Sequence, residues 1–185
     1  MPPRPSKWIK RNDRPEPLLS PSVMQGRNGN TPTSQPNQSF APITNQPISA
    51  FRATSNMNLS VAANAASGVL FQNEQFDLAN EYNPDTSTFS LRTAGVYSLN
   101  ASVEFQANAN VDFNLEVVFL VNQDVVGGNN ETQAGNLPAV AITEILQLNA
   151  GDTVTVAMRR STAAGTIQAT TRTRFAAARV PSLTS

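Results

Sequence analysis

Proline is distributed so unevenly along this chain that it divides the sequence into two parts. Ten of the thirteen prolines lie before Ile48. Each proline fixes φ and removes a backbone hydrogen-bond donor, so neither a helix nor a sheet can extend far in such a segment. Between Gln25 and Gln46 the residues are mostly Asn, Gln, Ser, Thr, Gly and Pro, which bury too little apolar surface to offset the entropy of ordering. We therefore expect residues 1–47 to form an extended arm and residues 48–185 to form one folded domain.

The two parts carry opposite charge, although the whole chain is formally neutral. Residues 1–47 hold six basic and two acidic residues, and the remainder holds seven basic and eleven acidic ones. Overall neutrality gives no signal for nucleic-acid binding. The chain contains neither His nor Cys, which removes disulfides, imidazole bases, thiolate nucleophiles and the usual zinc sites. This composition predicts a protein that is not an enzyme.

Two apolar patches interrupt the polar arm, at Trp8 and Ile9 and at Leu18 and Leu19. One interpretation is that they anchor the chain to a protein scaffold, and the other is that the arm folds back on its own domain. Both stay open at this point. No apolar run approaches the roughly 18 residues that span a bilayer, and the first residues lack the apolar stretch of a secretory signal. We expect neither a membrane span nor secretion by that route.

From Ile48 onward, short β-type runs alternate with turn residues, which predicts an all-β domain. The alternation is clear from Tyr97 to Phe105, where apolar and polar residues take turns, and from Val154 to Met158. Gly127-Gly128-Asn129-Asn130 is interpreted as a connector between strands. The expected strands are 48–53, 68–71, 88–91, 95–105, 111–122, 140–148, 152–159 and 167–180, a number typical of a two-sheet sandwich.

The run Val117 to Val121 is continuously apolar, as expected for a strand covered on both faces. In a two-sheet sandwich one face of each strand is normally free. A second burying surface is therefore predicted, and Val117, Phe119 and Val121 are candidates for a subunit interface.

Several motifs in this domain resemble the globular C1q and tumour necrosis factor heads. The stretch from Tyr82-Asn83 through Phe89 to Gly95-Val96-Tyr97 is similar to the signature of C1q-like domains, and Leu146 to Val154 resembles their Gly-Asp corner. The resemblance implies a jelly-roll β-sandwich that trimerises, of bacterial or viral type. The motif residues that it singles out are Asn83, Phe89, Gly95, Tyr97, Gly151, Asp152 and Phe175. We expect Gly95 and Gly151 to enter positive φ at turns.

The arm departs from this family because it has no Gly-X-Y repeat and hence no collagen stalk. Some C1q-like heads bind calcium, and the carboxylates that are weak candidates for such a site here are Asp112, Glu116, Asp124 and Glu131. No other cofactor is expected.

Other charged groups have two interpretations each. The pairs Asp77 with Glu81 and Glu104 with Glu116 are conceivable glycosidase carboxylates, but charges on alternating strands usually face solvent. The five arginines near the C-terminus either line one basic surface or pair with acidic residues across strands: Arg159, Arg160, Arg172, Arg174 and Arg179.

These observations predict a structural protein on the surface of a virion, such as a spike, fibre or decoration component. Its head would be a homotrimer, and its arm would anchor it to a capsid scaffold. The alternatives are a spore-coat protein and a module that binds a glycan or a receptor.

Overall fold

The computed structural model describes residues 48–133 and 139–181, and the regular structure within these ranges consists of β-strands. The thirteen strands are β1 (Ala50–Thr54), β2 (Leu59–Val61), β3 (Ser67–Gly68), β4 (Asn73–Asp77), β5 (Tyr82–Asn83), β6 (Thr88–Ser90), β7 (Gly95–Ala107), β8 (Phe113–Val121), β9 (Asp124–Gln133), β10 (Ala139–Leu148), β11 (Thr153–Ser161), β12 (Gly165–Ile167) and β13 (Arg174–Arg179). The prediction of an all-β domain is confirmed.

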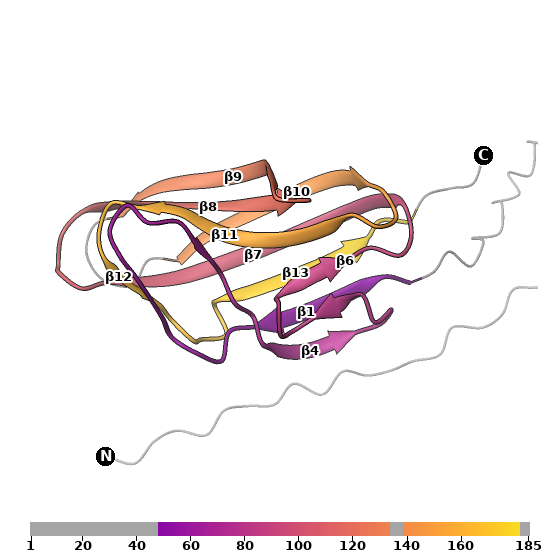
Figure 1. Cartoon of the computed structure of the whole chain (residues 1–185), viewed down its shortest axis with the longest axis horizontal. Helices are drawn as coiled ribbons and strands as arrows, with labels where there is room; N and C mark the ends of the chain where they lie inside the picture. The colour runs from indigo at the N-terminus through magenta and orange to yellow at the C-terminus, as the bar shows by residue number, and fades with distance from the viewer. Residues whose placement is uncertain (1–47, 134–138, 182–185) are drawn as a thin grey trace, which may run out of the picture. The chain divides into compact units, whose positions relative to one another are not determined.

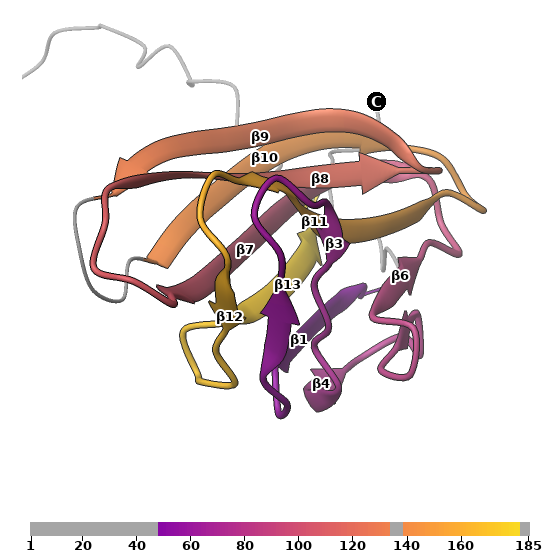
Figure 2. The same ribbon diagram turned by 60° about the vertical axis from the view of Figure 1, so that its left-hand side comes forward.

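Two antiparallel sheets lie face to face (Figures 1 and 2). One sheet has the order β2-β12-β7-β13-β1-β4, with β10 also paired to β7. The other has the order β5-β6-β11-β8-β9, with β3 also paired to β11. Below they are called the seven-stranded and the six-stranded sheet. Sequential strands repeatedly fall in opposite sheets, which is the jelly-roll arrangement predicted from the motifs.

Strand β7 organises the seven-stranded sheet because it is long enough to pair with three neighbours. It pairs with β13 and β12 along one side and with β10 along the other. The predicted alternation is confirmed, since the apolar residues from Tyr97 to Phe105 are fully buried between the sheets. The alternation of β11 is also confirmed, with Val154, Val156 and Met158 in the core.

Aromatic rings fill the space between the sheets. Phe175 on β13 is fully buried, and its ring lies 4.8 Å from that of Phe51 and 5.9 Å from that of Phe119 on the opposite sheet. Phe89 is also fully buried and packs against Phe51 and Tyr97. The motif aromatics therefore hold the two sheets together.

The interpretation of Gly127 to Asn130 as a connector is wrong, because these residues lie in the middle of β9. Residues 124–133 contain two glycines and several polar residues, which are poor strand formers in isolation. Pairing with β8 along its whole length overrides this preference. The short strands β2, β4 and β12 also lie outside or at the margins of the predicted runs.

The arm and its candidate anchors, Trp8, Ile9, Leu18 and Leu19, lie outside the described residues. The boundary at residues 47 and 48 therefore stays a prediction. Within the described ranges, no helix has the length and apolarity to cross a membrane.

Candidate interaction surfaces

Most side chains on the outer face of the seven-stranded sheet are small or uncharged, and strand register arranges them in rows. Strand register places Ala50, Ala178, Ser98 and Ile145 in one row across β1, β13, β7 and β10. The next row toward the other end contains Arg52, Ala176, Asn100 and Thr143, and the Asn100 amide donates to the Thr143 hydroxyl at 2.8 Å. Apart from Arg52, these two rows carry no charged side chain.

One end of this face is apolar and exposed. Backbone bonds continue the ladders past the strand ends, from Leu78 N to Ala50 O and from Val180 N to Val96 O. The alternation then directs their side chains outward. Of the ten most exposed large apolar residues in the described ranges, six lie on this face: Ile48, Phe76, Leu78, Val96, Ile145 and Val180. We call this set the apolar face. Contiguous exposed apolar surface of this kind usually marks an interaction site.

Strands β9 and β10 form one edge of the sandwich, where the two sheets approach each other. The Asn129 amide donates to the Ala141 carbonyl across this edge at 3.0 Å. A Cβ on Gly127 would collide with the side chain of Glu144, so glycine makes room for that carboxylate. Val125 and Val126 are exposed on β9. This β9–β10 edge is a second surface that combines apolar and acidic groups.

Two turns are joined at one end of the sandwich. Asn122 and Gln123 have φ of 51° and 76° and form the two-residue turn between β8 and β9. The Asn122 amide donates to Asp152 at 2.8 Å, and Thr153 N donates back to the Asn122 side-chain oxygen at 3.0 Å. Bonds from the backbone N–H of Asn149 and from Asn122 hold the pKa of Asp152 below its usual value. The motif residue Asp152 thus fixes the corner.

The two motif glycines have different physical roles. Gly151 has φ of 92°, as predicted. Gly95 is not in the positive-φ region, so the expectation for it is wrong. A Cβ there would lie 2.5 Å from Nε of Arg179, and the glycine instead makes room for a guanidinium. Arg179 donates to the Ala94 carbonyl at 2.8 Å.

The other motif residues serve the fold. The Asn83 side chain accepts from Asp85 N at 2.9 Å and closes a turn. The Tyr97 hydroxyl donates to Thr93 O at 2.7 Å, and burial raises the pKa of this phenol. These bonds are structural.

Glu81 and Glu104 do not face solvent as predicted, because each is only 5 % exposed. Glu81 accepts hydrogen bonds from the Ser49 hydroxyl and from Arg92 N. Glu104 lies on the outer face of β7 beneath the segment that precedes β13, where it accepts from Thr170 at 2.6 Å and pairs with Arg172 at 3.5 Å. Both carboxylates are used in packing. Asp77 likewise accepts from two backbone amides nearby.

Val117 and Phe119 are fully buried in the core of a single chain, and Val121 is half-buried against that core. On the other side of β8, Val118 is also buried. Residues 117–119 are therefore covered without a second chain, and a subunit interface at Val117, Phe119 and Val121 stays a prediction.

The arginines do not form one basic surface. Arg159 and Arg160 lie on β11 in the six-stranded sheet, whereas Arg174 and Arg179 lie on β13 in the other. The pairing interpretation is confirmed for Arg159, which contacts Glu116 at 3.2 Å, and for Arg172 with Glu104.

The four candidate calcium ligands are spread along β8 and β9. Asp112 precedes β8 and Asp124 begins β9, while Glu116 and Glu131 lie within these strands. Within residues 48–133 and 139–181, no group of three carboxylates is close enough together to hold a metal ion.

Comparisons with known proteins agree with this architecture. The family model described as the C1q domain matches residues 50–177. Eiger TNF from S. frugiperda is similar in structure, with a TM-score of 0.57 and 12 % identity over 76 % of this chain and 97 % of that chain. Murine APRIL at pH 5.0 has a TM-score of 0.55 and 12 % identity over 72 % of this chain and 99 % of that one. No curated protein matches the sequence significantly.

Proposed function

The chain belongs to the C1q domain family, and on that premise we propose that it is a non-enzymatic surface protein whose jelly-roll head forms a homotrimer. The observation that carries the proposal is the apolar face. Its most exposed members, Ile48 and Ile145, are 72 % and 68 % exposed in the single chain. Covering them would stabilise the complex by about 25 cal/mol for each Å² of apolar area that is removed from water. Association of copies is a direct way to cover such a face.

A closed ring requires two different patches on each subunit, since its interfaces are heterologous. The apolar face provides one patch, and the β9–β10 edge with Val125 and Val126 provides the other. Ile145 lies on β10, where the two patches meet. In the proposed trimer, the edge of each copy packs on the apolar face of the next.

We assign the arm of residues 1–47 the role of an anchor to a larger protein scaffold. The prediction rests on its proline content, on its net charge opposite to that of the head and on its apolar patches at Trp8-Ile9 and Leu18-Leu19. A virion is the preferred particle, with the protein as a spike, fibre or decoration component. A spore coat is the alternative particle, and a head that recognises a glycan or receptor would leave the arm a mere linker.

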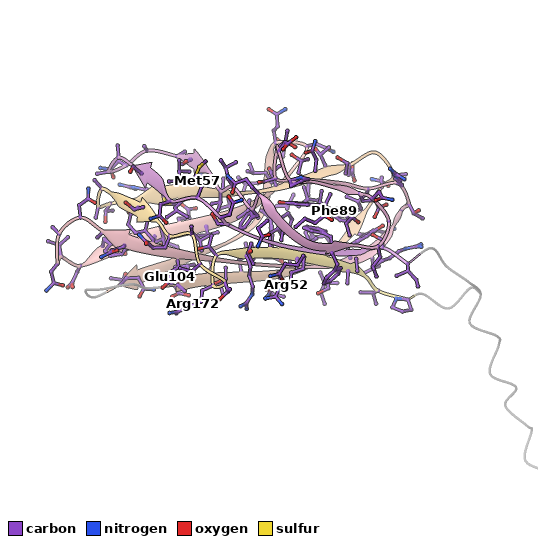
Figure 3. All side chains as sticks on the ribbon, turned by 90° about the horizontal axis from the view of Figure 1, so that it is seen from below. Arg52, Met57, Phe89, Glu104 and Arg172 are labelled. Carbon is purple, nitrogen blue, oxygen red and sulfur yellow. The ribbon has the colours of Figure 1, made fainter. Side chains whose placement is uncertain are left out.

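The trimer is tested by light scattering and sedimentation of the full chain. We expect a trimer at micromolar concentration, and Ile145→Asp should weaken it because a charge would enter the interface. Met57→Asp is the matched control: Met57 is 62 % exposed and lies on the opposite side of the domain from Arg52 (Figure 3). A monomeric wild-type chain, or equal effects of both substitutions, would contradict the proposal.

Deleting residues 1–47 tests the anchor separately. The truncated head should still trimerise but should be lost from purified particles. If the truncated head is incorporated as well as the full chain, the anchoring role is wrong.

A further inference from the structure

Two arginines on the outer face of the seven-stranded sheet carry uncompensated charge. Arg52 on β1 and Arg174 on β13 are diagonal neighbours on adjacent strands, and both side chains are half-buried. Among the described residues, neither guanidinium has a hydrogen-bond or ion-pair partner. Like charges on neighbouring strands repel each other unless an anion lies between them or beside them. This face therefore favours a negatively charged partner.

The β9–β10 edge has the complementary charge. The two strands contain Asp124, Glu131 and Glu144 and no Lys or Arg. The Glu144 side chain lies over Gly127 in the gap between the sheets and has no polar partner in the described part of the chain. Among the described residues, Glu131 accepts hydrogen bonds only from neutral amides on its own strand. Both carboxylates are half-buried, so their charge is incompletely screened by water.

The two sets of charges lie at matching heights along β7. The register places Arg52 level with Asn100, through Ala176, and places Glu144 level with Leu99. Along the strand direction, Arg52 and Glu144 are therefore only one residue apart, although they lie on different surfaces of the domain.

The remaining groups follow the same order. Toward one end, Ile145 is level with Ser98 on β7. At this end lie the exposed residues of the apolar face and, on the edge, Val125 and Val126. Toward the other end, Arg174 is level with Ser102 on β7. The Asn129 amide contacts Ala141 of β10, which is also level with Ser102, and Glu131 lies two residues beyond Asn129. Apart from Asp124, which begins β9 near Leu146 and Leu148 at the apolar end, apolar groups thus match apolar groups, and basic groups match acidic groups.

We infer that Glu144 and Glu131 of one copy form ion pairs with Arg52 and Arg174 of the next copy in the trimer. This inference rests on the trimer proposed above. In the inferred trimer, the threefold axis is parallel to β7. Rotation about such an axis leaves the height of every atom unchanged, so groups at equal heights on the edge and on the face are brought together. The three identical contacts then neutralise Arg52 and Arg174 of every copy, and the pairs fix the register of the subunits.

The pairs make the assembly sensitive to salt. Partly exposed ion pairs weaken as ionic strength rises, because the Debye length falls from about 10 Å at 0.1 M to about 3 Å at 1 M. The trimer dissociation constant of the full chain should therefore increase between these two salt concentrations.

Charge reversal tests the pairing directly by sedimentation of the full chain. Arg52→Glu and Glu144→Arg should each raise the trimer dissociation constant by roughly tenfold or more, since each change is repeated at three contacts. The double variant should return to within about threefold of the wild type, because it restores the pair in the opposite sense. Arg160→Glu is the control, since it makes the same charge change on the six-stranded sheet.

Glu144→Gln is added because it retains the side-chain volume beside Gly127, and thermal unfolding of every variant reports whether the head is folded. Glu144→Gln should weaken the trimer by a smaller factor than Glu144→Arg. A wild-type monomer would overturn the trimer and the pairing together. A wild-type trimer that is unaffected by the single reversals, or weakened by them without rescue in the double variant, would overturn the pairing alone.

Discussion

Replacing Gly165 with alanine would show how tightly the sandwich is closed beside β12. Gly165 is buried where β12 pairs with both β7 and β2. A Cβ there would collide with the backbone oxygen of Gln106 and with the Phe105 ring, whose Cε1 would lie 2.8 Å away. The carbonyl belongs to β7 and cannot yield without shifting the central strand. Overpacking of this kind costs about 1–3 kcal/mol, and displacing β12 would also break ladder bonds of about 1 kcal/mol each.

We therefore expect Gly165→Ala to lower the free energy of unfolding by about 3–5 kcal/mol, a large share of the roughly 5–15 kcal/mol of a typical domain. Urea unfolding followed by circular dichroism measures it. Gly68→Ala is the matched control, since Gly68 is exposed, lies on a strand and would place its Cβ in open space, so a change within about 0.5 kcal/mol is expected. A loss below about 1 kcal/mol for Gly165→Ala would refute the steric argument.

Three further predictions concern the motif region. Gly95→Ala should cost about 1–2 kcal/mol in urea unfolding because of Arg179, and below about 0.5 kcal/mol in an Arg179→Ala background; equal costs would contradict the contact. Burial raises the pKa of Tyr82 to about 12. The unfolded chain then loses this proton first, so stability should fall as pH rises from about 10 to 12, and Tyr82→Phe should reduce that fall. Asn122→Ala should raise the lowered pKa of Asp152 in an NMR titration, although the bond from the backbone N–H of Asn149 remains. The stability that this carboxylate contributes is present above its ordinary pKa and is lost as pH falls through the lower pKa of the folded state.

The sequence was sufficient to predict the parts of the fold where one strand carries its own evidence. In β7, each core residue from Tyr97 to Phe105 is followed by a polar one, and the period of two directs core and polar residues to opposite faces. The corner from Leu146 to Val154 was predictable for a similar reason, because Gly151 permits the positive φ that the turn requires.

Strand β9 was not predictable, because what stabilises it lies outside its own residues. Gly127 and Gly128 lower its intrinsic preference for a strand, but the first makes room for Glu144 and the second faces Val118 on β8. These contacts join β9 to two other strands, and the residues of β9 alone do not reveal them. The burial of Glu104 was missed for the same reason, since its cover comes from the segment around Thr170.

The proposed trimer contact lies on other residues than those that the sequence indicated. The continuous apolar run at Val117 to Val121 first favoured a subunit interface, because a sandwich strand normally leaves one face free. In the folded chain Val117 and Phe119 complete the core. The exposed side chains that need cover, such as Ile145, instead occur in strands whose inward residues already fill the core. The proposed trimer therefore uses side chains that the finished domain leaves exposed, on the seven-stranded sheet and the β9–β10 edge, where substitutions can separate assembly from folding.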